Sequence, residues 1–68
     1  MTKQQIKAAC TYAGISVNQL AAEINQTQPN LFSKIQRETL KDNELKEIAA
    51  AIGAKYFCYF EFEDGTRI

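Results

Sequence analysis

The chain contains no histidine and only two cysteines, Cys10 and Cys58. Both cysteines stand among apolar neighbours, and neither belongs to a Cys-x-x-Cys pair. Because zinc sites are built from clustered cysteine and histidine ligands, we expect no metal and no cofactor. The absence of histidine also removes the commonest general base. With 68 residues the chain is too short to enclose a substrate cleft, so we expect that it is not an enzyme.

Long apolar runs are missing as well. No stretch approaches the roughly 20 residues of a membrane span and no signal peptide is evident, so we expect a cytoplasmic protein without membrane contact. Hydrophobic residues make up 46% and charged residues 24% of the chain, a balance typical of folded proteins. A chain of 68 residues forms one small core of marginal stability, for which dimerisation is a common remedy.

Charge is unevenly distributed along the chain. The net charge is zero, yet residues 1–37 carry +3 and residues 38–68 carry −3. Zero net charge argues weakly against nucleic-acid binding. The basic first half argues for it, because a basic surface can face phosphate groups; scattered surface charge is the alternative interpretation.

Apolar residues repeat at helical spacing in four segments. Glycines end the first and the last of these segments, at Gly14 and Gly53. Asp42 and Glu44 lie in the first turn of the last segment, where carboxylates favour the positive end of the helix dipole. The first two predicted helices cover about residues 3–13 and about residues 17–24. The third starts after Thr27 and is followed by a connector over residues 36–41, and the fourth covers about residues 42–52.

Residues 16–35 predict two short helices around a tight turn. Ser16 and Thr27 each stand where a helix N-cap is needed. We expect Asn25 to lie in the turn, because asparagine tolerates positive φ better than other non-glycine residues. Pro29 lies in the first turn of the following helix, where its missing N–H costs nothing. Two helices joined in this way can present one helix to the major groove of DNA.

The pattern changes after residue 54. Residues 56–63 are rich in strand formers and end at Asp64-Gly65, a turn signal. Only three residues follow the turn, so we expect a strand without a full partner in its own chain. Such an edge pairs most economically with the same strand of a second copy, which gives a homodimer. The predicted dimerisation residues are Tyr56, Phe57, Cys58, Tyr59, Phe60 and Phe62.

Residues 2–53 resemble the helix-turn-helix family of Cro and the phage repressors, also called the xenobiotic-response-element type. The family pattern expects apolar residues at three positions and a small residue at a fourth. All four are met, by Leu20, Ile24 and Leu31 and by Ala21. Residues 45–53 resemble the helix that follows the recognition helix in this family.

The resemblance implies a mostly α fold, a compact bundle of four or five helices that contains a helix-turn-helix. The prediction for the whole chain is then a single domain over residues 1–68. Residues 2–53 form its helical core, and residues 54–68 add a C-terminal β-strand or short hairpin, which we expect to be the dimerisation element.

Three positions depart from the family pattern. Asn25 stands at the turn, where glycine is usual, and Gln26 follows where an apolar residue is usual. Lys34 lies three residues after Leu31, again at a position that is usually apolar. We expect Ile35 to supply the missing packing in its place.

The resemblance also implies a function, that of a transcriptional regulator, most simply a repressor. Such a protein binds a palindromic operator in double-stranded DNA as a homodimer; no small-molecule effector is evident from the sequence. Base-reading side chains come from the exposed start and outer face of the second motif helix, which here are Thr27, Gln28, Pro29, Asn30, Phe32, Ser33 and Gln36. The candidates for phosphate contact are Asn18, Gln19, Lys34 and Arg37.

Two alternative interpretations stay open. Polar residues such as Gln28 and Ser33 are solvated on many helices that bind nothing, and Phe32 packs into a core as readily as it touches a groove. The second alternative is a protein-interaction module, such as an antitoxin or anti-repressor, whose aromatic tail binds a partner protein. A salt-sensitive mobility shift with DNA favours the regulator, and a stable complex with another protein favours the module.

Overall fold

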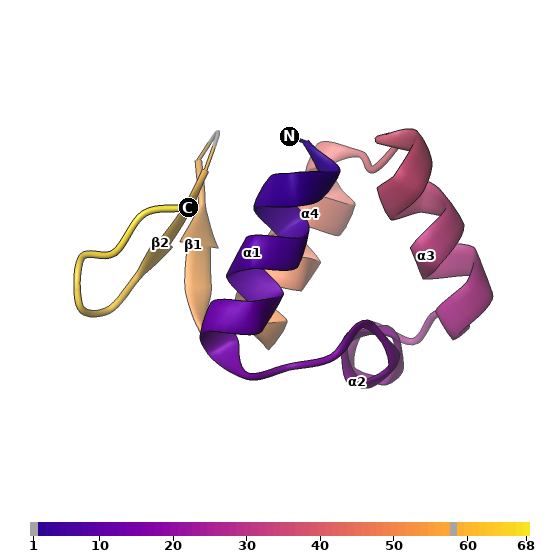
Figure 1. Ribbon diagram of the computed structural model, residues 1–68, viewed down its shortest axis with the longest axis horizontal. Coiled ribbons are helices and arrows are strands. Elements are labelled where there is room, and N and C mark those ends of the chain that lie inside the picture. Colours follow the sequence, from indigo (N-terminus) through magenta and orange to yellow (C-terminus); the bar gives the residue numbers. More distant parts are fainter. Residues whose placement is uncertain (1, 58) are drawn as a thin grey trace.

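The computed structural model describes residues 2–57 and 59–68 of the chain. In these residues four helices are followed by a two-stranded antiparallel sheet (Figure 1). The elements are α1 (Lys3–Ala13), α2 (Val17–Glu23), α3 (Gln28–Arg37), α4 (Asp42–Ala51), β1 (Ala54–Tyr56) and β2 (Phe60–Phe62). The predicted mostly α fold with a C-terminal strand or short hairpin is therefore confirmed, and the C-terminal element is a hairpin. No helix of the described residues combines the length and apolar composition that a membrane crossing needs.

The first two helices begin with reciprocal caps. The Thr2 hydroxyl accepts a hydrogen bond from the Gln5 backbone N–H at 3.2 Å, and the Gln5 side chain accepts one from the Thr2 N–H at 2.9 Å. Ser16 and Gln19 repeat this arrangement at the start of α2, at 3.1 and 2.9 Å. Gly14 ends α1 with a left-handed φ of 72°, which glycine adopts without steric cost. The cap at Ser16 and the end of α1 at Gly14 therefore match the predictions.

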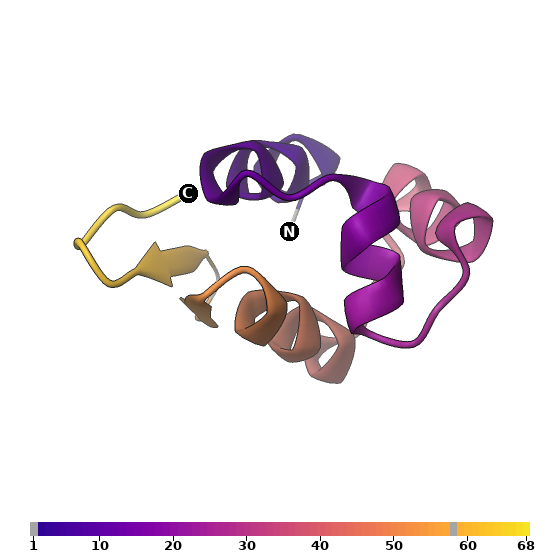
Figure 2. The ribbon, with the colours of Figure 1, turned by 90° about the horizontal axis from the view of Figure 1, so that it is seen from below.

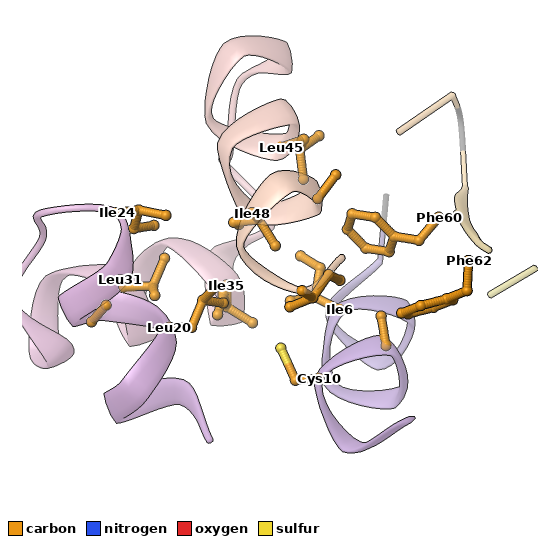
Figure 3. Packing of buried hydrophobic residues seen from close by; sticks show 14 residues of the cluster. Ile6, Cys10, Leu20, Ile24, Leu31, Ile35, Leu45, Ile48, Phe60 and Phe62 are labelled. Atoms are coloured by element: carbon orange, nitrogen blue, oxygen red, sulfur yellow. The ribbon is translucent and has the colours of Figure 1, made fainter. Parts of the chain in front are cut away.

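The core draws on all four helices and on the second strand (Figure 3). Leu20, Leu31 and Ile35 are each 0% exposed, so the expectation that Ile35 replaces Lys34 in the packing is confirmed. Cys10 is buried among these apolar side chains, and burial raises the pKa of its thiol. A buried, protonated thiol packs as a small apolar group and is a poor nucleophile.

The C-terminal segment is not the single strand predicted for residues 56–63. β1 and β2 pair with each other, Ala54 opposite Phe62. The chain end then returns along the other edge of β2, where Phe60 and Ile68 exchange backbone hydrogen bonds of 2.8 and 2.9 Å. The expectation that the strand lacks a full partner in its own chain is therefore wrong, since β2 pairs with β1 along its whole length. A strand of three residues needs only a short partner on each edge.

Burial explains why the segment folds back on its own chain. Phe60 is 0% and Phe62 8% exposed, and the Tyr12 ring of α1 packs on Phe62 with centroids 4.6 Å apart. These two phenylalanines are core residues, so their assignment to a dimer contact is corrected. Of the other residues predicted for dimerisation, Phe57 is 52% exposed, and Tyr56 and Tyr59 are half-buried. Cys58 lies outside the described residues.

Candidate nucleic-acid interface

The candidate interface is formed by α2, the four-residue connection over 24–27, and α3. Asn25 has a left-handed φ of 58°, as its place in the turn predicts. The Thr27 hydroxyl accepts a hydrogen bond from the Asn30 backbone N–H at 3.4 Å, and Pro29 lies in the first turn of α3. These residues make the turn short and start α3 at a defined point.

The α3 helix lies at one end of the molecule, and no other element covers its outer side (Figures 1 and 2). Figure 1 looks along α2 and sees α3 from the side, so the two helix axes cross steeply. Its apolar residues Leu31 and Ile35 point into the core (Figure 3). The helix therefore has one packed side and one side open to a ligand.

The residues predicted to read bases remain accessible in the structure. Phe32 is 42% exposed and is not part of the core, so the alternative that it packs inside is wrong. The exposed base-reading candidates are Thr27, Pro29, Asn30 and Phe32, and the half-buried candidates are Gln28, Ser33 and Gln36. They offer amide and hydroxyl groups around one aromatic ring, which is chemistry suited to base edges and thymine methyl groups.

Three of the four phosphate candidates are exposed. Asn18 and Gln19 lie in the first turn of α2, and Arg37 lies in the last turn of α3. Gln19 Oε1 accepts a hydrogen bond from the Ser16 N–H, which orients the Gln19 amide. At the far end of α3, the Lys3 N–H donates to the Glu38 carboxylate at 2.9 Å and joins the start of α1 to the residue that follows α3.

Lys34, the fourth phosphate candidate, is directed to α4. Its Nζ lies 2.6 Å from Oε2 of Glu44, and Gln26 Nε2 donates to the same oxygen at 3.3 Å. The other Glu44 oxygen accepts a hydrogen bond from the Lys41 backbone N–H at 3.2 Å. One carboxylate therefore connects α3, the turn before it and the start of α4. We call Gln26, Lys34 and Glu44 the Glu44 cluster.

The Glu44 cluster is partly screened from solvent. The Glu44 side chain is 14% exposed and that of Lys34 is 33% exposed. The hydrogen bond from Lys34, followed by that from the Lys41 N–H, lowers the pKa of Glu44. Gln26 Oε1 is buried without a hydrogen-bond partner among the described residues. A buried acceptor without a partner lowers the stability of the fold, so the polar residue at this position has an energetic cost.

Sequence reasoning did not find this cluster. It assigned Glu44 only to the helix dipole, and it treated Gln26 and Lys34 as separate departures from a pattern. The two departures belong together, since both side chains bind the same carboxylate. The available signal was the pair of polar residues at positions expected to be buried, because buried polar groups require partners.

The candidate face is almost neutral. Residues 16–37, all of which are described, contain Glu23, Lys34 and Arg37 as their only charged residues. With Lys34 paired to Glu44, Arg37 is the cation of this segment for which the described residues provide no acidic partner. Contact with phosphates would therefore depend on few charges, and a large share of any binding would come from polar and apolar contacts to bases.

No protein-family model, no curated protein and no solved structure matches this chain. The relation to Cro and the phage repressors therefore remains a prediction, which rests on the residues that carry the resemblance.

Proposed function

We propose that the protein is a sequence-specific regulator of transcription that binds double-stranded DNA, acts as a repressor and works as a homodimer on a palindromic operator in the cytoplasm. The observation that carries the proposal is the outer side of α3, which is uncovered and bears the predicted base-reading residues (Figure 2). Occupying an operator is sufficient for repression, and this function needs neither a cofactor nor a catalytic group.

The chemistry of this side supports the proposal. Gln28 can make a bidentate pair with adenine, and Ser33 can donate to or accept from several bases. The exposed ring of Phe32 can contact a thymine methyl group. Asn18, Gln19 and Arg37 flank these residues and can fix the register by phosphate contacts.

Dimerisation is supported by the exposed aromatic ring at the tip of the hairpin. Phe57 is 52% exposed and its ring lies 5.5 Å from that of Tyr59, centroid to centroid. The hairpin and α3 lie at opposite ends of a molecule that measures 31 × 19 × 19 Å (Figure 1). Two copies joined at their hairpins must therefore be inclined to each other to bring their α3 helices about 34 Å apart, one turn of DNA.

The proposal is tested by selecting bound duplexes from random DNA at low salt and then measuring affinity by fluorescence anisotropy. We expect a palindromic consensus and tighter binding of it than of scrambled DNA. Gln28→Ala is expected to reduce this preference, whereas Asn43→Ala, a matched change on the exposed side of α4, is expected to leave it unchanged. Failure to enrich any sequence, together with a stable complex with another protein, would favour the interaction module instead.

A further inference from the structure

Lys34 has two possible anionic partners if α3 enters a groove of DNA. One is a backbone phosphate, as the sequence pattern suggests. The other is Glu44, whose carboxylate already lies 2.6 Å from the Lys34 ammonium. If Lys34 binds a phosphate, its charge strengthens binding to DNA of any sequence, because phosphate contacts carry no sequence information. If Lys34 stays bound to Glu44, its charge does not contribute to this binding.

The surroundings of Glu44 favour the internal partner. The carboxylate is anchored by the Lys41 backbone N–H and by Gln26, so it does not have to be ordered when it binds Lys34. Its low exposure limits the screening of the pair by water and salt. Glu44 is ionised at neutral pH even at its ordinary pKa, and the hydrogen bond from Lys34, which lowers this pKa, favours the charged form further.

We propose that Glu44 is a specificity-determining positioning residue, which holds Lys34 at α4 and so withholds its charge from DNA phosphates. This inference rests on the proposed function. Specificity is the difference between binding to the operator and binding to other DNA. Withholding one cation weakens sequence-independent binding, while the polar contacts of α3 to bases are retained.

The test uses Glu44→Gln, which keeps the shape of the side chain and an oxygen for the Lys41 N–H but removes the charge that holds Lys34. Affinities for the selected operator and for scrambled duplex are measured as a function of salt concentration. Releasing one lysine to a phosphate steepens the dependence of log K on log salt by about 0.9. We expect this steeper slope, a several-fold gain in affinity for scrambled DNA, and a smaller ratio of operator to scrambled affinity.

Two controls separate the release of Lys34 from a general change in charge. Glu47→Gln removes the same charge from an exposed position on α4 that has no ion pair with Lys34, and we expect the slope to stay as in the parent. Lys34→Met in the Glu44→Gln background is expected to restore the parent slope, because no released ammonium remains. Circular dichroism melts establish that each variant is folded at the temperature of the measurement.

Lys34→Met in the otherwise unchanged protein provides an independent test, which also serves if Glu44→Gln does not fold. We expect the salt slope to be unchanged, in contrast to Arg37→Met, which is expected to flatten it by about 0.9. A flattened slope in Lys34→Met, or an unchanged slope in folded Glu44→Gln, overturns the inference while the proposed function stands. A parent protein that binds no duplex at low salt overturns the proposed function, and the inference with it.

Discussion

The two ends of the molecule use their polar side chains differently. At the α3 end, the outer residues Gln28, Asn30 and Ser33 make no side-chain hydrogen bond among the described residues. At the hairpin end, the Tyr12 hydroxyl binds Asp64 and lies 3.1 Å from the Thr66 hydroxyl, and Arg67 pairs with Glu61 at 3.0 Å. The α3 end therefore keeps its polar groups available for a ligand, whereas the hairpin end satisfies most of them internally.

The apolar residues show the same contrast. The hairpin end inserts Phe60 and Phe62 between α1 and α4 (Figure 3). Its tip residue Phe57 is exposed. The α3 end contributes Leu31 and Ile35 to the core and leaves Phe32 at the surface. Each end thus has buried residues that stabilise the fold and exposed aromatic side chains that a partner could cover: Phe32 at the α3 end, and Phe57 and Tyr12 at the hairpin end.

The largest expected effect is the loss of the hairpin anchor. Phe60→Ala is expected to lower the free energy of unfolding by about 3–5 kcal/mol, because it removes a fully buried ring from the core. A domain of this size has a total stability of roughly 3–10 kcal/mol, so much of the protein would unfold. Urea denaturation followed by circular dichroism measures the change. Phe57→Ala at the exposed tip is the control, and an equal loss in both variants would contradict the contrast between buried and exposed rings.

The next effect concerns the exposed tip as a dimer contact. Phe57→Lys is expected to yield a folded monomer whose operator affinity is lower by about 10²-fold or more, since linked half-site contacts become single ones. Sedimentation at micromolar concentration measures the oligomeric state. Ala50→Lys adds the same charge to the exposed side of α4 and should leave the dimer intact. A parent protein that is monomeric with and without DNA ends the dimer hypothesis.

Smaller effects are expected on the ligand side of α3. Gln28→Ala or Ser33→Ala should weaken operator binding by about 1–3 kcal/mol per lost base contact. The free energy of unfolding should change by no more than about 0.5 kcal/mol, because neither side chain is part of the core. Anisotropy titrations and urea denaturation test the two halves of this prediction. If both variants bind operator and scrambled DNA as the parent does, the reading face is assigned wrongly.

The two ends also differ in how well sequence reasoning predicted them. The helix starts at Ser16 and Thr27 and the turn at Asn25 were predictable, because each depends on a residue and its near neighbours in the chain. The fold of the C-terminal hairpin was not predictable in this way, because it depends on which phenylalanine side chains pack into the helical core. That is a property of packing between distant segments, as the contact of Tyr12 with Phe62 shows.

The Glu44 cluster lies between these cases. Its three members were all visible in the sequence as polar residues, but their meeting depends on the crossing of α3 and α4. The spacing of Gln26 and Lys34 gave no indication that one carboxylate on another helix would bind both. Long-range polar contacts of this kind are therefore where the structure adds most to the candidate interface.

The smallest expected effect is the pH dependence of the two polar anchors, Glu44 near α3 and Asp64 at the hairpin. The hydrogen bond from Tyr12, followed by that from the Thr66 N–H, lowers the pKa of Asp64, as Lys34 lowers that of Glu44. A carboxyl group whose pKa is lower in the folded state stabilises the fold above its unfolded pKa, about 3.9 for Asp and 4.3 for Glu. This stabilisation is lost as the pH falls through the folded value.

Thermal melts between pH 7 and pH 2.5 should therefore show a decline in melting temperature that begins below about pH 5. Tyr12→Phe should reduce the part due to Asp64, Lys34→Met should reduce the part due to Glu44, and the double variant should show the weakest acid dependence. A decline that is the same in all four proteins would mean that neither anchor is coupled to folding.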